Sequence, residues 1–161
     1  QMVELVTANQ GFYKRTRRGK VVQITREKVL RSADSCGFVL GEKLTVDGLR
    51  DIVHKGPLPH LLVLDTNAAL QNIDVLESRM NVMTNVVVLQ TVMQELQHLN
   101  QGVSRRLLAL MKDKAKSYIF FPNEFYKETV CMRVNGESPN DANDRAVRAA
   151  TKYFCGNFAC R

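Results

Sequence analysis

Three acidic residues, Asp65, Glu95 and Asp144, stand at corresponding places beside apolar segments of the sequence. Asp65 ends an apolar run, Glu95 lies about one turn into a helical pattern, and Asp144 lies in the first turn of the last helical pattern, after Asp141. Because none lies in a run of charges, we expect each to face a partly buried crevice. Converging carboxylates repel one another and lose solvation unless a cation neutralises them. The expected cation is Mg²⁺ or Mn²⁺, which takes oxygen ligands and promotes in-line displacement at phosphorus.

Each of these acids also has an ordinary structural interpretation. Residues 65–67 read Asp-Thr-Asn, and all three types cap helix N-termini well. Glu95 and His98 have the spacing of an exposed helical pair, whereas Asp141 and Asp144 are first-turn residues that the helix dipole favours. Considered together at the ends of predicted strands, the acids favour a site over these separate structural roles.

The elements that position the acids follow an alternating pattern. Four residues of unbroken apolar character in Leu61–Leu64 suit a strand buried on both faces of a parallel sheet, and helical spacing follows at once. The pattern predicts further strands at 21–26, 86–89 and 118–121, and helices at 46–53, 66–76, 91–99, 105–116 and from 141 onward. Gly102 is expected to end one helix and Ser104 to cap the next. This order predicts an α/β fold with a central parallel sheet flanked by helices, in which ligands bind beyond the carboxyl ends of the strands.

The composition points to a polyanionic partner. The chain has 161 residues and a net charge of +7, from 23 Lys and Arg against 16 Asp and Glu. A basic periphery around an acidic centre is what a metal-dependent nuclease needs. No apolar run approaches the roughly 20 residues of a membrane span, and the first ten residues lack a secretory pattern. The four cysteines form no C-x-x-C pair, which favours reduced intracellular thiols over a zinc site or a disulfide scaffold.

The most basic stretch is Gly11–Lys20, in which five of ten residues are Lys or Arg and Phe12 and Tyr13 stand beside them. Cations there could meet phosphates while the aromatic rings stack on bases, or the stretch could be a solvated arm. The predicted RNA-binding residues are Lys14, Arg15, Arg17, Arg18 and Lys20. The basic helix around Arg105–Lys116 leaves the same two alternatives open.

The motifs LLVLDTN at 61–67, VVVLQTVMQEL at 86–96 and NDANDRAVRAA at 140–150 together resemble the PIN domain family of metal-dependent ribonucleases. Within it, the chain looks like the N-terminal PIN domains of the RNase II-type exosome nucleases. The resemblance implies that Asp65, Glu95 and Asp144 are catalytic and bind Mn²⁺ or Mg²⁺. It also implies supporting residues behind these ligands, namely Thr66, Asn67, Thr91 and Asp141.

The resemblance further implies endonucleolytic hydrolysis of single-stranded RNA in a protein that also carries a 3′–5′ exoribonuclease. The implied partners are this RNA and the exosome core, with no membrane and no small-molecule cofactor. The implied location is the nucleus, including the nucleolus, with some protein in the cytoplasm. The alternative is a non-cutting PIN-fold adaptor that binds RNA and docks the nuclease to protein partners.

The resemblance also implies a division into domains, and the chain departs from the family pattern at two points, the fourth acid and a cysteine cluster. The implied division is a basic extension and connecting segment at 1–59 and a PIN-like domain at 60–161, with the C-terminal strand and the family's fourth acid expected beyond Arg161. Relatives often carry three clustered cysteines that help to dock the exosome core, whereas here only Cys36 stands in that region.

Overall fold

A mixed five-stranded sheet forms the centre of the computed structural model, which describes residues 6–32, 35–55, 60–79 and 83–158. Its strand order is β4-β3-β7-β6-β5. The parallel part consists of β5 (Leu62–Val63), β6 (Val86–Leu89) and β7 (Ile119–Phe121). Two short strands, β3 (Phe38–Val39) and β4 (Glu42–Lys43), extend it, with β3 antiparallel to β7. The predicted parallel sheet flanked by helices is therefore confirmed, with an antiparallel edge added.

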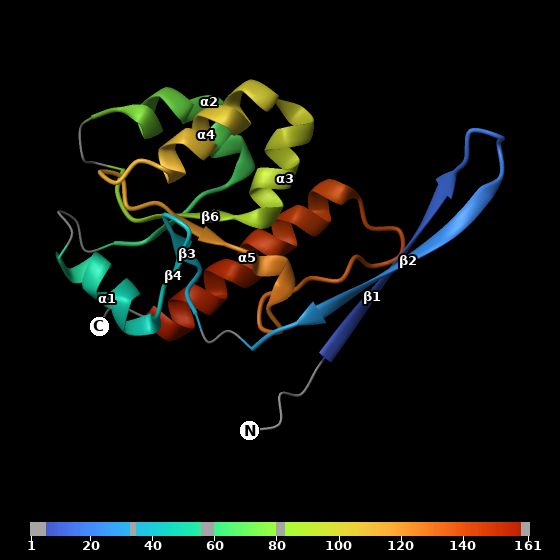
Figure 1. Ribbon diagram of the computed structural model, residues 1–161, viewed down its shortest axis with the longest axis horizontal. Helices are drawn as coiled ribbons and strands as arrows, with labels where there is room; N and C mark the ends of the chain where they lie inside the picture. Colours follow the sequence, from blue (N-terminus) through green and yellow to red (C-terminus); the bar gives the residue numbers. More distant parts are fainter. Residues whose placement is uncertain (1–5, 33–34, 56–59, 80–82, 159–161) are drawn as a thin grey trace.

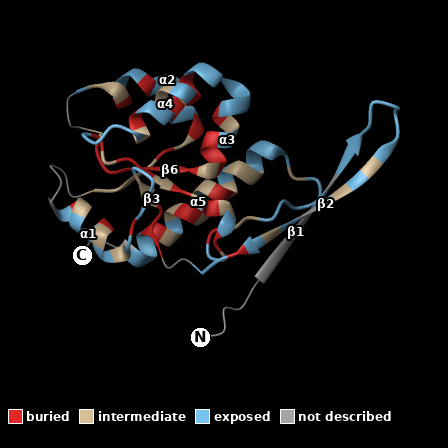
Figure 2. Ribbon diagram, viewed as in Figure 1, coloured by how far each residue is buried: buried red, intermediate tan, exposed pale blue. Residues whose placement is uncertain are grey.

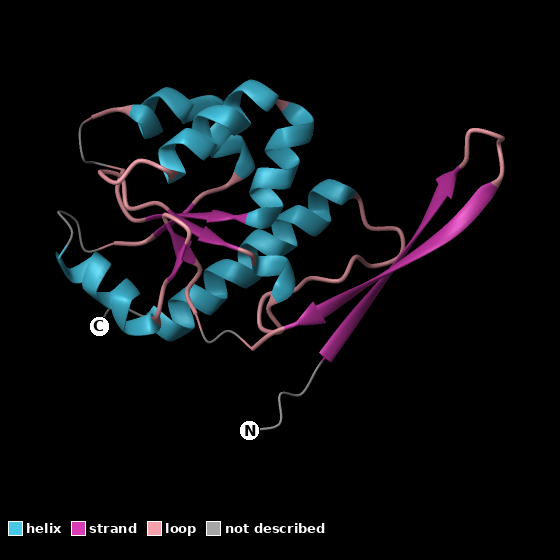
Figure 3. Ribbon diagram, viewed as in Figure 1, coloured by secondary structure: helices cyan, strands magenta, loops and turns pink. Residues whose placement is uncertain are grey.

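Helices cover both faces of this sheet. Figure 1 shows α2, α3 and α4 on one side and α1 and α5 on the other, and Figure 3 shows the strands lying between these layers. The helices are α1 (Val46–Lys55), α2 (Thr66–Glu77), α3 (Gln90–Leu99), α4 (Gln101–Met111) and α5 (Pro139–Phe158), with the 3₁₀ helix η1 (Asn123–Phe125) after β7. Across the described ranges, none of the helices combines the length and apolar character that a membrane crossing requires.

The core lies along β6, whose four residues are all buried. This burial on both faces explains why its sequence is a continuous apolar run and not an alternating one. Buried residues in Figure 2 gather on the sheet and on the helix faces turned toward it. Strand β5 is at the sheet's edge, and both of its residues are only partly buried.

The segment before β3 is held tightly against the sheet. Gly37 has a φ of +109°, and a Cβ atom at this position would overlap the carbonyl oxygen of Phe120 on β7. Its neighbour Cys36 has no exposed surface, and burial raises the pKa of its thiol to about 11. Cys36, Cys131 and Cys155 are free thiols, and Cys160 lies outside the described residues.

The basic stretch forms part of a β-hairpin that extends away from the body of the molecule (Figure 1). Strand β1 (Val6–Arg15) pairs with β2 (Val21–Leu30) along its whole length, so the strand predicted at 21–26 is present and longer. The base of the hairpin is attached to η1 by an ion pair between Lys28 and Glu124. Next to it, the backbone N–H of Arg31 donates to the carbonyl oxygen of Phe125 at 2.9 Å.

Several helix ends differ from their predicted positions. Asn100 adopts an extended backbone and its side chain accepts from the N–H of Val103 at 3.1 Å, so α4 starts at Gln101. The predictions that Gly102 ends a helix and that Ser104 caps one were wrong, because both lie inside α4. The same helix ends at Met111 and not near Lys116.

Candidate active site

Asp65 lies directly beyond β5 and caps the N-terminus of α2. Its backbone is extended, with φ −94° and ψ 154°, and its side chain Oδ2 accepts from the N–H of Asn67 at 3.2 Å. Helix capping by this triplet is therefore confirmed, and it engages one carboxylate oxygen of the half-buried aspartate. The side chain of Asn67 is exposed.

Thr66, the residue after Asp65, binds Glu95. Its hydroxyl donates to Oε2 of Glu95 at 2.6 Å, although the two residues are 29 positions apart. Thr66 is 4% exposed, so this bond is shielded from competing water. His98 instead lies with Nδ1 2.7 Å from the carbonyl oxygen of Gln94. The structure thus brings Glu95 beside the residue that follows Asp65.

Asp141 and Asp144 lie on the first turns of α5. The hydroxyl of Ser138 donates to Oδ2 of Asp141 at 2.7 Å and accepts from the N–H of Asp141 at 3.1 Å, which is a reciprocal capping arrangement. This cap starts α5 at Pro139, earlier than predicted. Asp144 is exposed, on a helix that packs against α3.

The three predicted ligands are not gathered into one cluster. Among the described residues, no group of three or more His, Cys, Asp or Glu side chains is placed to hold a metal ion. The donor chemistry still suits a hard cation, since Asp65 and Glu95 each offer carboxylate oxygens and, within the described ranges, neither is hydrogen-bonded to a cationic side chain. Asp65 and Glu95 therefore fit as oxygen ligands.

Thr91 is held by Asn123, a residue from the segment after β7. The N-cap position of α3 is occupied by Leu89, whose side chain cannot cap the helix. Oδ1 of Asn123 instead accepts from the N–H of Thr91 at 3.2 Å, and its Nδ2 donates to the Thr91 hydroxyl oxygen at 2.8 Å. Asn123 is 1% exposed. A side chain from elsewhere in the fold thus supplies the cap that α3 lacks.

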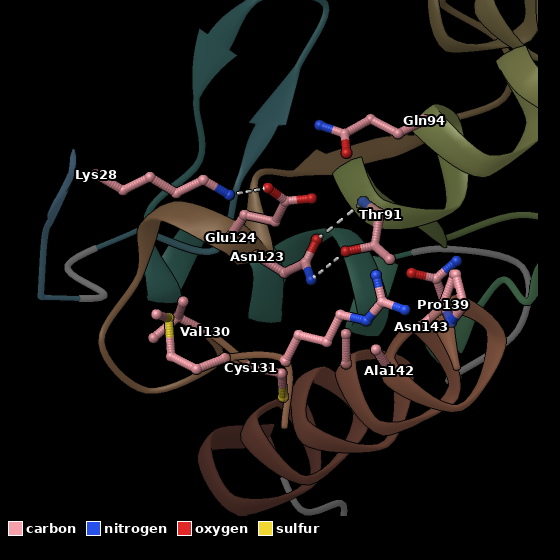
Figure 4. Close-up of a pocket in the computed structure, with 13 residues that line it drawn as sticks. Lys28, Thr91, Gln94, Asn123, Glu124, Val130, Cys131, Pro139, Ala142 and Asn143 are labelled. Carbon is pink, nitrogen blue, oxygen red and sulfur yellow. Dashed lines mark hydrogen bonds and ion pairs between the residues drawn. The ribbon is translucent and has the colours of Figure 1, made fainter. Parts of the chain in front are cut away.

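A pocket of about 240 Å³ lies beside this pair, and we call it the amide pocket (Figure 4). Its walls come from the hairpin base, α3, η1, the segment 130–133 and the first turns of α5. Its polar side chains are Lys28, Thr91, Gln94, Asn123, Glu124, Cys131, Arg133 and Asn143. Burial raises the pKa of the Cys131 thiol, which therefore stays protonated at neutral pH.

The predicted RNA-binding cations are on the outer part of the hairpin, and all five are exposed. The tip is ordered by local bonds, in which the N–H of Thr16 donates to the carbonyl of Lys20 at 2.8 Å. The basic helix is different, because Arg106 binds Asp74 and Glu77 on α2 and Lys116 is buried against the carbonyl of Ser78. These two cations serve the fold and are not available to phosphates.

Sequence reasoning missed Asn123, Gln94 and Asn143. The rule applied to Asp65, that residues just beyond parallel strands meet at one edge, also covers Asn123, two residues after the third strand. Gln94 and Asn143 precede Glu95 and Asp144 directly, but an amide next to an acid has no distinctive spacing.

Comparison with known proteins agrees with this fold and these motifs. A family model described as PIN domain matches residues 62–158. The exosome complex exonuclease RRP44 of Mus musculus is 38% identical over 155 residues, which are 91% of this chain and 16% of that protein. RRP44 of Homo sapiens is 37% identical over the same length, and RRP44 homolog A of Arabidopsis thaliana is 34% identical over 143 residues, 89% of this chain and 15% of that protein.

Among solved structures, the PIN domain of T. brucei RRP44 superposes with a TM-score of 0.58 and 30% identity, covering 62% of this chain and 56% of that one. The chain spans about 16% of the length of the mammalian relatives.

Proposed function

The chain belongs to the PIN domain family, and from this premise we propose that it is a divalent-metal-dependent endoribonuclease domain that cuts single-stranded RNA. The observation that carries the proposal is the bond between Thr66 and Glu95. It brings Glu95, from the helix after β6, next to Thr66, the residue that follows the acid at the end of β5. Such convergence at the carboxyl ends of parallel strands is where α/β folds place their ligands.

In this proposal Asp65, Glu95 and Asp144 hold Mn²⁺ or Mg²⁺, which when bound supplies an activated water and neutralises charge at the phosphate. Thr66 fixes one oxygen of Glu95 through its 2.6 Å bond, and the N–H of Asn67 fixes one oxygen of Asp65. Because each carboxylate keeps its second oxygen, both remain able to act as ligands. Thr91 supports the start of α3, the helix that carries Glu95, and Asp141 the start of α5, which carries Asp144.

The exposed cations of the hairpin, Lys14, Arg15, Arg17, Arg18 and Lys20, are assigned to the RNA backbone. They carry a positive charge on a segment that extends from the body, which suits capture of a flexible polyanion. Binding through phosphates predicts affinity that falls steeply with salt and depends little on base sequence.

The test is incubation of the chain with a circular single-stranded RNA and Mn²⁺, with Asp65→Asn and Asn67→Ala in parallel. A circle has no ends, so only an internal cut makes it linear. We expect the unaltered chain to open the circle, Asp65→Asn to be inactive, and Asn67→Ala to retain cutting because its backbone N–H remains. A circle that stays closed at millimolar Mn²⁺ while RNA is bound would refute the nuclease proposal.

A second function has one observation in its favour. Since the described residues hold no cluster of three potential metal ligands, a PIN-fold adaptor that binds RNA and docks a nuclease to protein partners is the alternative. Calorimetric titration with Mn²⁺ separates the two. A nuclease binds the ion and loses that binding in Asp65→Asn, whereas an adaptor gives the same small heats with both proteins.

The curated relatives are several times longer than this chain and are called exosome complex exonucleases. We extend the proposal accordingly to an exosome-associated protein that processes and degrades RNA, carries a 3′–5′ exoribonuclease elsewhere in its length, contacts the exosome core and resides mainly in the nucleus. Cys36 offers no exposed thiol for that contact.

A further inference from the structure

We propose that the amide pocket binds one nucleobase of the RNA strand and that Gln94 and Asn143 determine which base is preferred. The inference rests on the proposed function for its ligand, single-stranded RNA. It assigns base discrimination to two side chains that the nuclease proposal does not use.

The pocket has the size and lining of a site for one small planar group. Its volume is about 240 Å³, below the roughly 300–1,000 Å³ of pockets for drug-sized ligands. Val130, Met132, Ala142 and Ala146 give it apolar surface against which a ring can lie. Unstacked bases of single-stranded RNA are recognised by stacking on aromatic rings or Arg guanidinium planes and by hydrogen bonds at the base edge, and Arg133 supplies a guanidinium group to this lining.

Two amides in the pocket have unused hydrogen-bonding capacity. Gln94 is exposed and Asn143 partly buried, and in the described part of the chain neither side chain hydrogen-bonds to another residue; Figure 4 shows them on α3 and α5. An amide presents two N–H donors and an acceptor side by side, which matches the paired donor and acceptor groups of a base edge. The Asn123 amide, by contrast, is already engaged through both its oxygen and its nitrogen by Thr91. It forms a fixed wall and does not select the base.

The position of the pocket connects it to the proposed chemistry. Gln94 is followed directly by Glu95, and Asn143 by Asp144. Adjacent side chains on a helix point about 100° apart, so the acids lie around the helix from the two amides and outside the pocket lining. A base held by Gln94 and Asn143 thus contacts the same two helices, α3 and α5, that carry Glu95 and Asp144. The pocket is also lined by Lys28, from the base of the hairpin whose outer part carries the five exposed cations.

The charges around the pocket tolerate a phosphate at its rim. Glu124 is neutralised by Lys28, and Glu137 by Arg145. Arg133 is exposed at the pocket and donates through Nε and Nη2 to the backbone carbonyl of Glu137, at 3.0 and 2.9 Å, while its charge also helps to lower the pKa of the Glu137 carboxyl. An acidic protein side chain would use this charge but would leave the two amides without matched partners, which favours a nucleotide as the occupant.

The test measures binding without cutting. Labelled 12-residue homopolymers of U, A, C and G are titrated in EDTA against the unaltered chain, Gln94→Met and Asn143→Leu, which keep similar shape but remove the hydrogen-bonding groups. Asn140→Leu is the matched control, because it is exposed on the same helix turn and does not line the pocket. Melting temperatures establish that each variant is folded.

We expect the unaltered chain to prefer one base on the order of tenfold and each pocket variant to reduce that preference to within about twofold. Asn140→Leu keeps the preference, and Arg17→Ala with Arg18→Ala weakens all four polymers alike. The inference is overturned if the unaltered chain binds all four equally, or if the preference survives in both pocket variants. Because no metal is present, a chain that never opens the RNA circle can still support this inference, and a chain that opens it can still refute it.

Discussion

Replacing Asn123 tests whether a side chain from outside α3 caps that helix. Asn123→Leu keeps the volume but removes both bonds to Thr91, at 3.2 and 2.8 Å. Loss of a cap costs about 0.5–2 kcal/mol, and a buried polar group without a partner costs about 1–3 kcal/mol. Since Thr91 is 6% exposed, water cannot easily replace the amide, so we expect a total loss of about 2–4 kcal/mol.

Urea unfolding followed by circular dichroism measures this loss. With an m-value of about 2 kcal/mol per molar urea, the midpoint should fall by roughly 1–2 M. Asn140→Leu, an exposed substitution of the same kind, should change stability by no more than about 0.5 kcal/mol.

A double-mutant cycle isolates the pair from other effects of the substitution. Thr91→Val removes the hydroxyl that accepts from Nδ2 of Asn123 but keeps the backbone N–H that Oδ1 caps. The double variant Thr91→Val with Asn123→Leu has neither the hydroxyl nor the amide, and its N–H at residue 91 lacks the cap just as in Asn123→Leu. The double variant should be less destabilised than the sum of the two single variants by at least about 1 kcal/mol. Strict additivity would refute the side-chain bond between Asn123 and Thr91, whereas a loss below about 1 kcal/mol for Asn123→Leu alone would refute the capping role.

Three further substitutions probe other parts of the fold. Arg145 holds the pKa of Glu137 at about 2, so Glu137 stabilises the fold above its ordinary pKa of 4.5 and loses this effect as the pH falls toward 2. The melting temperature of Glu137→Gln should therefore lie below that of the unaltered chain at pH 7 and converge with it near pH 2. A difference in melting temperature that stays constant with pH would contradict this. Gly37→Ala should lower the free energy of unfolding by more than about 2 kcal/mol in urea, because the left-handed backbone costs about 1–2 kcal/mol and the added Cβ clashes with β7. The control Gly136→Ala, at φ +85° in open space, should lose only the backbone contribution. The buried hydroxyl of Tyr118 donates to the carbonyl of Leu76 at 3.2 Å. Tyr118→Phe should therefore lower the free energy of unfolding by about 1 kcal/mol and speed amide hydrogen exchange in the last turn of α2. Unchanged exchange in that turn would count against the bond.

The parallel part of the fold was predictable because its signals are local. An apolar run that ends at Asp65 and is followed by helical spacing specifies a strand, a turn and a helix within a few residues. The same holds for β6, where burial on both faces leaves an unbroken apolar sequence. These two elements fix where Asp65 and Glu95 lie.

What the sequence did not reveal depends on distant pairing. Strands β3 and β4 have two residues each, too few to show an alternating pattern, and β3 is defined by its pairing with β7. Strand β1 has a mostly polar sequence, and in the described part of the chain it pairs with β2 alone, which leaves Tyr13, Lys14 and Arg15 exposed. The position of Asp144 depends on how α5 is rotated against α3, which periodicity gives only to within part of a turn.

The attachment of the hairpin to η1 has a thermodynamic consequence. The three residues of η1 bind the hairpin through Glu124 and Phe125, and α3 through Asn123. Hairpin and amide pocket therefore share one small structural unit. If a strand bound at the hairpin shifts η1 and changes pocket affinity by some factor, a base in the pocket changes hairpin affinity by the same factor. RNA affinity at the hairpin and base affinity in the amide pocket would then be linked by one coupling free energy.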